Sequence, residues 1–478
     1  MKTILIAGIL LLACMLSPCV YGQHSSIDLT TPMSPDPAIR TGKLDNGLTY
    51  YIRKNGKPEK RIEMRLVVNA GSILENDDQK GLAHFMEHMN FNGTRNFPKN
   101  DLIDFLQKTG VKFGADINAY TSFDETVYML QLPTDDSSLV STGYQVLVDW
   151  AHYALLDGKE IDKERGIIEE EWRMGLGAQD RMMKKFLPVI FKDSRYAERL
   201  PIGSIDVIRN FQHETLRNFY RDWYRPDLQA VIVVGDLDPD VAEAKIKSAF
   251  GGLANPAAPR TRENYDLPDN EEPLIAITTD KEATSNFLLV FYKHPVTPDK
   301  TLADFLDQTM AELYTGMLNN RLNEISLKPD APFVFAQSDY GQFLARSKDA
   351  FMINAMPKEN QIGKTLEIIL AENERVKRFG FTATEFERQK EELMTRYEKA
   401  SREADKTESS VFCGQYVNHY LIGDAVPGAA RMFKYLKNIL PEITLEMVNG
   451  LAARWVTDRN LGRSEERRVG KEWRSRWS

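Results

Sequence analysis

The sequence predicts an α+β protein with two similar domains, each a mostly antiparallel sheet packed against helices. Strand and helix patterns are mixed along the 478 residues, in an order typical of helices packed on one side of a sheet. Residues 251–270 are rich in glycine, proline and polar side chains, which predicts a linker between the domains. A strand-then-helix order recurs after this linker and indicates a weak internal duplication.

The first domain is predicted at residues 41–255. A turn at Asp45-Asn46-Gly47 leads into its first strand, and residues 61–68 alternate between apolar and polar, so we expect a half-buried strand there. Spacing of apolar residues and turn signals predicts strands at 48–53, 61–68, 116–122, 125–132 and 228–235, and helices at 81–94, 98–108, 139–156, 160–175, 211–224 and 241–250. An irregular stretch is expected before residue 211.

The second domain is predicted at residues 268–460 and has no metal-binding motif of its own. Its expected elements are strands at 274–279 and 286–292, helices at 301–325 and 361–379 with strands between them, a long helix at 383–404 and a last helix near 443–456. If this domain is a duplicate of the first, it has lost the motif described below or never had it.

The N-terminus predicts export. Lys2 precedes a short apolar core and then small residues, which is typical of a secretory signal peptide at residues 1–22, followed by a polar, proline-rich linker at 23–40. A lipoprotein site at Cys14 ranks second, because leucine stands where a small residue is usual. Only Cys413 remains after cleavage at the signal, so no intrachain disulfide is expected. No second apolar stretch of about 18 residues exists, so no membrane span is expected in the mature chain.

Composition excludes some partners. The chain is 42% hydrophobic and 27% charged, as in ordinary globular proteins, and its formal net charge is -8. No long basic run lies in the body of the protein, so nucleic acid is not an expected partner.

The chemistry centres on residues 81–94, where His84, Glu87 and His88 share one helix face and an apolar stripe occupies another. Two imidazoles one turn apart can reach the same tetrahedral ion at about 2.0–2.1 Å. The carboxylate between them can take a proton from a metal-bound water. The order His-x-x-Glu-His is the inverse of the commoner zincin motif. The alternative is a helix whose two histidines and glutamate are ordinary surface residues.

A third ligand is expected from residues 164–172, which contain four glutamates. Glu164 and Glu171 share a helical stripe with Ile167 and Ile168, and the isoleucines are expected to turn that stripe inward. A buried carboxylate is stabilised when it ligates a metal ion. We therefore predict Glu171 as the third ligand and Glu164 as the acid that orients a ligand. Glu169 and Glu170 lie off this stripe and are expected in solvent. The alternative is a charged face without a role.

Two neutral histidines and one carboxylate leave an open coordination position, which is typical of catalytic rather than structural zinc. We expect one Zn²⁺ per chain and hydrolysis of peptide bonds by a metal-activated water, with Glu87 as the base that later protonates the leaving amine.

Three stretches together resemble the pitrilysin/insulinase family of zinc metallopeptidases, the inverzincins of family M16. They are residues 81–94, the helix from Glu164 to Glu171, and residues 195–203 with the sequence Arg-Tyr-Ala-Glu-Arg-Leu-Pro-Ile-Gly. The resemblance covers about residues 40–460 and is best to bacterial periplasmic members. It implies His84, His88 and Glu171 as zinc ligands, Glu87 as base, Glu164 as supporting acid, and a periplasmic location.

The resemblance also implies how a substrate binds. The family pairs unfolded peptides with an edge strand that follows the histidine helix, and residues 118–121 are similar to that motif, with Asn118 and Ala119 as the substrate-binding residues. A plain hairpin strand is the alternative. Long members close two such halves as a clamshell, whereas short ones pair two chains. A second half, either absent from this chain or supplied by another, is therefore an expected partner, and it would bring the family's substrate-anchoring arginine and tyrosine.

The C-terminus differs in composition from the rest of the chain. Residues 463–478 are dense in arginine, glutamate and tryptophan and resemble a translated sequencing adapter. We interpret residues 461–478 as an artefactual tail on a truncated long member. A genuine basic interaction tail is the alternative.

Three functions compete at this point. The leading one is a zinc endopeptidase that acts on unfolded peptides. A non-catalytic partner or scaffold subunit is the second, although inactive relatives typically have broken site residues and all five candidates are present here. A zinc hydrolase of another type is the third.

Overall fold

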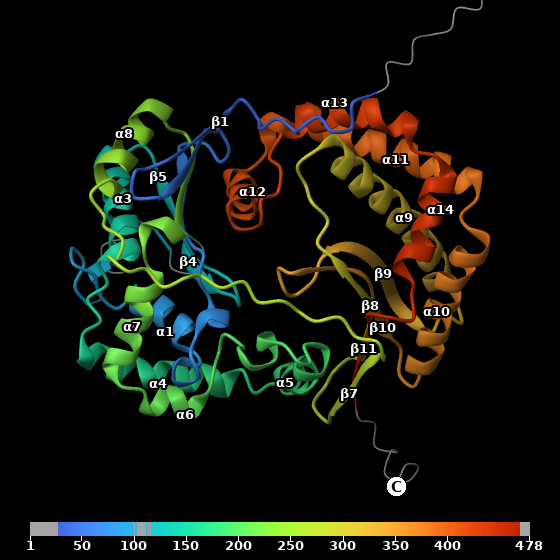
Figure 1. Ribbon diagram of the computed structural model, residues 1–478, viewed down its shortest axis with the longest axis horizontal. Helices are drawn as coiled ribbons and strands as arrows, with labels where there is room; N and C mark the ends of the chain where they lie inside the picture. The colour runs from blue at the N-terminus through green and yellow to red at the C-terminus, as the bar shows by residue number, and fades with distance from the viewer. Residues whose placement is uncertain (1–26, 100, 103–110, 113, 115, 469–478) are drawn as a thin grey trace, which may run out of the picture.

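The computed structural model describes residues 27–99, 101–102, 111–112, 114 and 116–468. The predicted signal peptide and most of the predicted helix at 98–108 lie outside these described residues. Figure 1 shows two lobes side by side, each a sheet with its own helices. We refer to residues 39–250 as the first lobe and residues 274–468 as the second. The α+β fold with mostly antiparallel sheets is confirmed.

The first lobe contains a six-stranded sheet in the order β1-β2-β6-β3-β5-β4. Its neighbours are antiparallel except for the parallel pair β2 and β6. The strands are β1 (Ile39–Lys43), β2 (Thr49–Lys54), β3 (Arg61–Val68), β4 (Ile117–Thr121), β5 (Thr126–Pro133) and β6 (Gln229–Gly235). The helices are α1 (Leu82–Met89), α3 (Ser137–His152), α4 (Gly158–Met174), α5 (Ala178–Ile190), α6 (Ile205–Asn210), α7 (His213–Trp223) and α8 (Pro239–Phe250). Strands β1 and β4 are the two edges of this sheet.

The second lobe contains a five-stranded sheet in the order β7-β11-β8-β10-β9. The strands are β7 (Leu274–Asp280), β8 (Phe287–Pro295), β9 (Phe333–Gln342), β10 (Lys348–Pro357) and β11 (Leu461–Arg468). The helices are α9 (Leu302–Ser326), α10 (Ile362–Phe379), α11 (Ala383–Arg402), α12 (Ser409–Ile422), α13 (Ala429–Ile439) and α14 (Leu445–Trp455). If β1 is set aside, the two sheets have the same strand order, including one parallel pair. This topology agrees with the predicted duplication.

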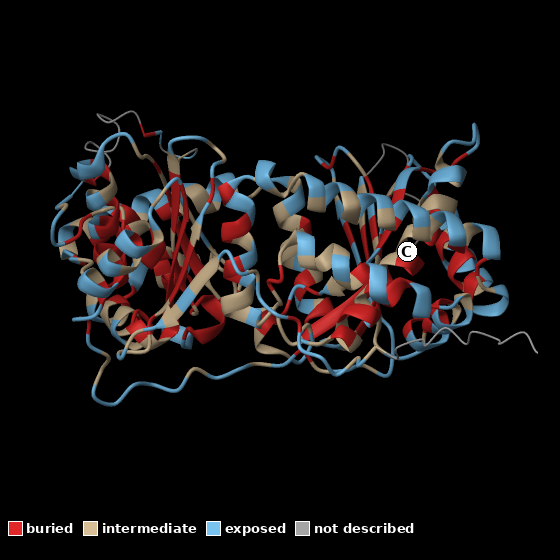
Figure 2. Cartoon of the chain, turned by 90° about the horizontal axis from the view of Figure 1, so that it is seen from above, coloured by how far each residue is buried: buried red, intermediate tan, exposed pale blue. Residues whose placement is uncertain are grey.

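The lobes exchange helices across their sheets. Helix α12 of the second lobe covers the face of the first sheet that α1 and α3 leave free, with Phe412, Tyr416 and Val417 packed on Val67, Ile232 and Val234. Helix α5 of the first lobe packs against β7 and β11, and Arg181 of α5 pairs with Asp280 at 2.6 Å. The two cores appear as red interiors in Figure 2, and Figure 1 shows α12 between the lobes.

This exchange corrects two expectations from the sequence. Strand β3 is buried on both faces rather than one, because α12 covers the side that holds Val67. The stretch expected to be irregular before residue 211 contains α5 and α6, and residues 405–442 contain α12 and α13. Helix α5 has an internal proline, Pro188, which is a sequence signal against a helix. Its packing on β7 and β11 of the other lobe is a tertiary contact that the sequence does not show.

Tyr416→Ala tests the exchange of α12. Tyr416 is 1% exposed and stacks on Tyr51 with ring centroids 5.7 Å apart, so its truncation is expected to lower the free energy of unfolding by about 3–5 kcal/mol. Phe379→Ala is the control, because Phe379 is 80% exposed and its loss should change stability by about 0.5 kcal/mol or less. Denaturant unfolding of both variants measures the difference. Equal stabilities would mean that α12 does not hold the lobes together.

The segment predicted as a linker at 23–40 is ordered where the structure describes it. The Leu302 amide donates to the Thr31 carbonyl at 3.0 Å, the Met33 amide donates to Lys300 at 2.8 Å, and Asp36 pairs with Arg53 at 2.7 Å. These residues run along the second lobe before the chain enters β1 in the first lobe. The segment therefore joins the two lobes rather than separating them.

Strand β11 occupies in the second sheet the position that β6 occupies in the first. All residues of β6 are buried, most of them apolar, whereas β11 reads Leu-Gly-Arg-Ser-Glu-Glu-Arg-Arg. Glu465 is 2% exposed and lies 3.0 Å from Arg463. Residues 461–468 thus lie inside the sheet, beyond the predicted domain boundary at 460. Burial of charged residues on an interior strand costs desolvation free energy, whereas burial of apolar residues does not.

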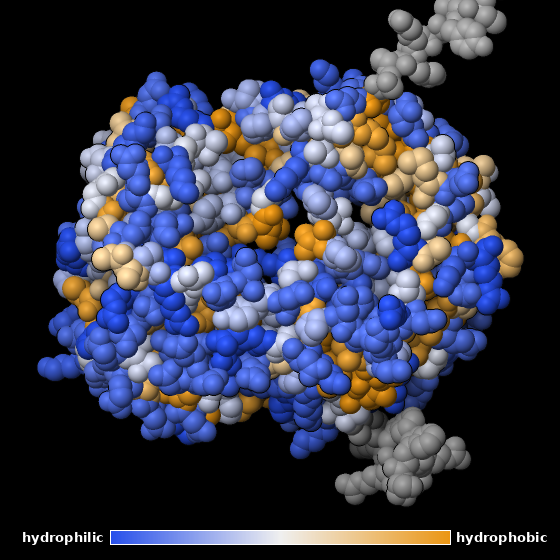
Figure 3. Space-filling model, viewed as in Figure 1, coloured by the Kyte–Doolittle hydropathy of each residue, from blue (hydrophilic) through white to orange (hydrophobic). Residues whose placement is uncertain are grey.

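Two further observations describe the surface. Among the described helices, none is long and apolar enough to cross a bilayer. Figure 3 shows a largely hydrophilic face with separate hydrophobic patches, one of them low on the second lobe. At the edge strand β7, Ile275 and Ile277 are each 50% exposed.

Candidate metal centre

Helix α1 forms and is placed as its pattern predicts. Its apolar stripe of Leu82, Phe85, Met86 and Met89 is at most 1% exposed and belongs to the core of the first lobe. This burial fixes the rotation of the helix, so that His84 and His88 share its other face. Their rings meet edge to face, with centroids 4.7 Å apart.

The two histidines converge with Glu171 of α4. His84 Nε2 and His88 Nε2 are 3.2 Å apart, and the Glu171 carboxylate oxygens lie 3.6 Å from the first and 3.4 Å from the second. One donor atom from each residue lies within 4.8 Å of the others. The structure thus brings together the three residues that the sequence singled out, although Glu171 lies more than 80 residues after the histidines in the chain.

Helix α4 also supplies the residue that orients His88. Glu164 is 4% exposed, and its Oε1 lies 2.8 Å from His88 Nδ1. The other oxygen of Glu164 accepts from the amide of Asn92, just after α1. With Nδ1 held by a carboxylate, His88 directs Nε2 toward His84 and Glu171. Metal-binding histidines are commonly held by a carboxylate in this way.

On α4, Glu164 and Ile168 are buried as expected, whereas Ile167 and Glu171, which were expected on the same inward stripe, are not. Ile168 is fully buried, whereas Ile167 is 54% exposed and Glu171 has a side chain that is 43% exposed. The buried face of α4 is therefore centred nearer Ile161 and Ile168, and the ligand lies at its rim. Of the two glutamates expected in solvent, the side chain of Glu170 is 60% exposed, while Glu169 pairs with Arg173 and Arg209.

Glu87 lies beside the same cluster, and a residue of the sheet holds its carboxylate in place by a hydrogen bond. It is 8% exposed, and the Thr121 hydroxyl at the end of β4 donates to its Oε2 at 2.6 Å. Burial raises the pKa of Glu87 above its usual value, and the hydrogen bond from Thr121 partly offsets that effect. A carboxyl group with a raised pKa is a better proton acceptor than an ordinary glutamate.

The two histidines differ in the direction of their pKa shifts. Burial lowers the pKa of His84 to about 4, and the neighbouring His88 adds to the effect. Burial also lowers the pKa of His88, but the carboxylates of Glu164 and Glu171 outweigh it and raise that pKa to about 9. The imidazole of His88 in turn lowers the pKa of Glu171. A positive charge is thus favoured at the point where the Nε2 atoms meet.

The donor set fits a zinc ion. Two Nε2 atoms that face each other at 3.2 Å can share one hydrogen bond or bind the same cation, and imidazole and carboxylate are both common zinc ligands. His84 Nδ1 is buried and has no hydrogen-bond partner among the described residues, so His84 lacks the support at Nδ1 that Glu164 gives to His88. The group offers three protein ligands, as catalytic zinc sites do.

The predicted substrate-binding residues lie on the edge strand beside this group. Asn118 is exposed and Ala119 is partly buried, and Asn118 Oδ1 accepts from the Ala119 amide at 2.9 Å. The strand that matches β4 in the second sheet is β9, whose Ser338 has its amide and carbonyl both hydrogen-bonded to the Asn319 side chain. An asparagine side chain therefore occupies backbone groups on both strands. On β4 it holds only the Ala119 amide, whereas on β9 it holds both the amide and the carbonyl of Ser338.

Two residues of the site escaped the sequence argument. Asn92 and Thr121 each hold one of the candidate acids, but a single asparagine or threonine outside a helix face has no periodicity that marks it. Asn92 follows α1 by three residues, and Thr121 ends the strand that was singled out for another reason. Only the tertiary contacts identify them.

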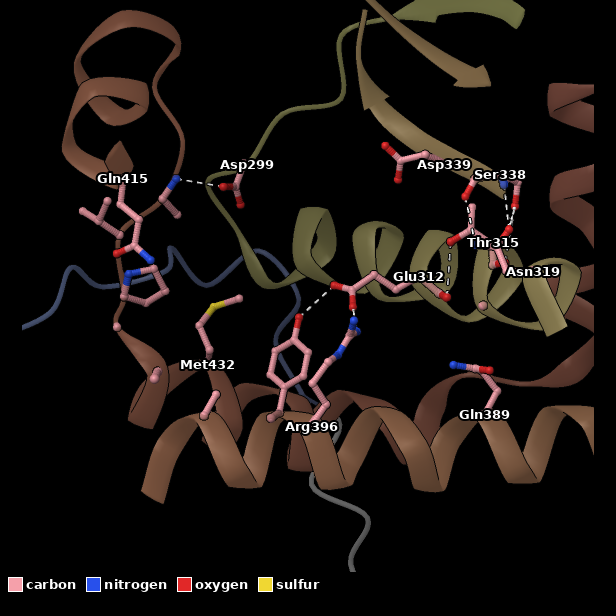
Figure 4. Close-up of a pocket in the computed structure, with 18 of the residues that line it drawn as sticks. Asp299, Glu312, Thr315, Asn319, Ser338, Asp339, Gln389, Arg396, Gln415 and Met432 are labelled. Carbon is pink, nitrogen blue, oxygen red and sulfur yellow. Dashed lines mark hydrogen bonds and ion pairs between the residues drawn. The ribbon is translucent and has the colours of Figure 1, made fainter. Parts of the chain in front are cut away.

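A cavity of about 690 Å³ lies elsewhere, in the second lobe between α9, α11 and the segment 425–432. Figure 4 shows its polar lining, in which Glu312 accepts from Tyr397 and pairs with Arg396. None of the metal-site residues lines this cavity. The candidate site therefore rests on the cluster in the first lobe.

Comparison with protein families gives two matches. Residues 50–193 match the model of insulinase (peptidase family M16), and residues 210–393 match the model of the peptidase M16 inactive domain. The first match contains every residue of the metal cluster, and the second covers most of the second lobe.

Curated relatives give the same grouping. The chain is 32% identical to the zinc protease PQQL-like of Arabidopsis thaliana over 85% of this chain and 40% of that protein. It is 35% identical to the probable zinc protease PqqL of Haemophilus influenzae over 73% of this chain and 38% of that one. The chain thus spans about two fifths of the length of the curated relatives that it matches.

Solved structures match the whole fold. The first half of the periplasmic protease PqqL from Escherichia coli superposes with a TM-score of 0.85 and 26% identity, covering 91% of this chain and 93% of that one. The complete PqqL gives a TM-score of 0.86 at 26% identity and covers 92% of this chain but 48% of that one. The two lobes together therefore correspond to one half of a longer peptidase.

Proposed function

The chain belongs to the insulinase (M16) family of peptidases, and from this premise we propose that it is a zinc-dependent endopeptidase that hydrolyses unfolded peptides. One observation supports the proposal most strongly. His84, His88 and Glu171 converge from two helices, and the buried carboxylate of Glu87 lies on the same face as the two histidines. Such an arrangement suits hydrolysis with a general base and without a covalent intermediate.

We assign the roles as follows. His84, His88 and Glu171 hold one zinc ion, Glu164 fixes the ring of His88, and Asn92 fixes Glu164. A bound zinc ion supplies Lewis acidity, which polarises the scissile carbonyl and lowers the pKa of an attacking water to about 7. Glu87 accepts the proton of that water and then delivers it to the amide nitrogen as the bond breaks. Thr121 keeps the Glu87 carboxylate aimed at this position.

The substrate is proposed to bind as an added strand on β4. An extended peptide gains main-chain hydrogen bonds from an edge strand with little demand on its sequence. Thr121 lies on this strand and contacts Glu87, so a peptide paired with β4 passes close to the base. Asn118 and Ala119 are the proposed contacts. The Ala119 amide now donates to Asn118 Oδ1, so this hydrogen bond must break before the amide can donate to a peptide. The matching position of β9 is closed by Asn319, which favours β4 over β9 as the pairing edge.

The partner and the location are proposed from the relatives. PqqL of Escherichia coli is described as a periplasmic protease, and this chain matches one half of it. We propose that a second half of the same kind, from a longer chain or another molecule, completes the enclosure. We also propose export to the periplasm after cleavage of residues 1–22. The domains are proposed at 41–255 and 268–460, with residues 461–478 foreign to them.

A non-catalytic partner subunit is the second candidate function. The observation in its favour is the match of residues 210–393 to the family's inactive domain. That match lies outside the metal cluster, which is complete in the first lobe. The peptidase is therefore the better-supported function.

Cleavage of a quenched peptide of about 20–30 residues tests the proposal, since that length suits an edge-strand site. Turnover is expected to stop when a chelator removes the metal and to return when zinc, but not magnesium, is added in excess of the chelator. Because this chain spans only about two fifths of its curated relatives, the assay is repeated with a C-terminal half supplied in trans. Turnover that survives complete removal of zinc would exclude the zinc peptidase. So would a zinc-loaded chain that cleaves no peptide, either alone or with the C-terminal half.

A further inference from the structure

The N-terminus of α1 is held by a residue outside the helix. The N-cap residue is Gly81, with φ of 101°, and it has no side chain that could cap the helix. Glu75 takes this role instead, since one of its carboxylate oxygens accepts from the Gly81 amide at 3.0 Å and the other from the Ala83 amide at 2.7 Å. These are two of the amides that a helix leaves without an internal partner. Ala83 directly precedes His84.

Glu75 is deeply buried and makes no contact with the proposed metal ligands. Its residue is 0% exposed, and burial raises its pKa to about 8 while the two amide hydrogen bonds lower it. The cap therefore depends on two well-placed acceptor oxygens rather than on a solvated charge. A buried carboxyl group in this position needs a reason, because burial without such partners is unfavourable.

The segment that contains Glu75 is itself fixed by the stretch 195–204, which the mechanism leaves unused. Arg195 donates to the carbonyls of Ile73 and Glu75, the first at 2.6 Å, and Arg199 Nε donates to the Glu75 carbonyl at 3.1 Å. Ser72 returns a hydrogen bond to the Arg199 carbonyl at 2.5 Å. The two arginines thus fix the backbone of Glu75 from one side.

The same stretch contacts the helix start directly. Gly203 has φ of 68°, and a Cβ at this residue would lie 2.2 Å from Gly81 Cα, which excludes any side chain. The Ser204 amide donates to the Lys80 carbonyl at 3.2 Å. Residues 195–204 therefore contact α1 at its first turn as well as through Glu75.

The two zinc-binding histidines depend on this support to different degrees. His88 is oriented by Glu164 through its Nδ1, whereas His84 Nδ1 has no partner among the described residues. A shift of the first turn of α1 would therefore displace His84 while His88 stays in place. His84 lies in this first turn, two residues after the start of α1, whereas His88 lies in the last turn.

We propose that Glu75 is a positioning residue of the metal centre, which with Arg195 and Arg199 fixes the first turn of α1 so that His84 Nε2 meets His88 Nε2 and Glu171. The inference rests on the proposed function only in taking these three residues as metal ligands. It assigns a role to the stretch 195–204 that no step of hydrolysis requires.

The test measures cobalt binding to the full chain, because Co²⁺ is visible in tetrahedral sites and needs no turnover. Glu75→Gln retains the size of the side chain but replaces one acceptor oxygen with a donor that faces an amide. It is expected to weaken Co²⁺ affinity by about 10–100-fold and to change the visible absorption of the bound ion. Asp349→Asn is the control, since Asp349 is 6% exposed, accepts from the Thr297 amide at 2.7 Å and lies in the second lobe.

A second variant covers the case in which Glu75→Gln does not fold. Arg195→Lys retains the charge but cannot reach both carbonyls, and a smaller change of affinity and spectrum in the same direction is expected. Wild-type affinity and spectrum in a folded Glu75→Gln or Arg195→Lys protein would overturn the inference, as would equal changes in Asp349→Asn. A wild-type chain that binds no Co²⁺ would overturn both this inference and the proposed function. Cobalt binding with these effects but without peptide cleavage would sink the proposed function alone.

Discussion

Replacing Glu87 with glutamine is expected to lower kcat for peptide cleavage by about 10²–10⁴-fold, the range associated with loss of a general base. Glutamine has the same shape and can still accept a hydrogen bond from Thr121, but it cannot accept the proton of the attacking water. The affinity for zinc should stay at the wild-type value, because Glu87 is not one of the converging donors. Turnover of the peptide and a zinc competition titration measure the two quantities.

Glu170→Gln is the matched control for this substitution. It makes the same chemical change on an exposed side chain of α4 that lies off the ligand stripe, so activity should change little. A Glu87→Gln variant that retains activity within a few-fold of Glu170→Gln would show that another group takes the proton. Loss of zinc together with activity would instead make Glu87 a structural part of the metal site.

Replacing Glu171 with glutamine is expected to have the largest effect on the metal. The substitution removes the only anionic ligand of the proposed set, and the remaining imidazoles leave the full charge of the ion without compensation. Loss of a residue that only hydrogen-bonds a metal ligand typically weakens metal affinity by about 10–100-fold, and loss of the ligand itself should weaken it by more. Peptide cleavage at one equivalent of zinc should disappear and return in part at high zinc concentration.

Competition with a chromophoric chelator measures this affinity directly, with Glu170→Gln again as the control. Both substitutions are on α4 and remove one negative charge, so a general electrostatic effect would appear in both. Zinc affinity that is unchanged in Glu171→Gln would remove Glu171 from the ligand set. Equal losses in the two variants would point to the net charge of α4 instead.

The local parts of the site could be predicted from the sequence because one helix carries them. Residues at i, i+3 and i+4 share a face by geometry alone, so the positions of His84, Glu87 and His88 follow from their spacing. The buried stripe of α1 then fixed which way that face points. The same reasoning on α4 predicted Glu171, which the structure places beside the two histidines, although Ile167 of the same stripe is exposed.

The remaining features depend on contacts between distant residues and leave no periodic signal. Helix α12 is buried by a sheet that lies more than 170 residues earlier in the chain, and α5 by a sheet that follows it. Thr121 contacts Glu87 of α1 from outside the helix through one hydrogen bond, and Glu75 contacts the start of α1 through two. Such pairings are set by the fold as a whole, which local propensity does not encode.

Strand β11 shows the opposite case, in which the local sequence and the fold disagree. The topology requires an interior strand at residues 461–468, as β6 provides in the first sheet, but the residues there are mostly charged. Glu465 is buried between Arg463 and Arg467. The domain was predicted to end at residue 460 because the composition changes there, whereas the structure continues the sheet to residue 468.

Extended X-ray absorption fine structure of zinc bound to the full chain tests the central claim most directly. One equivalent of zinc should show two imidazole ligands and oxygen ligands at about 2.0–2.2 Å, with one imidazole lost in His84→Ala. Cys413 is the single cysteine in the described part of the chain and is buried, so no sulfur ligand is expected. A sulfur shell at about 2.3 Å, or a spectrum that His84→Ala leaves unchanged, would place the metal elsewhere and contradict the account.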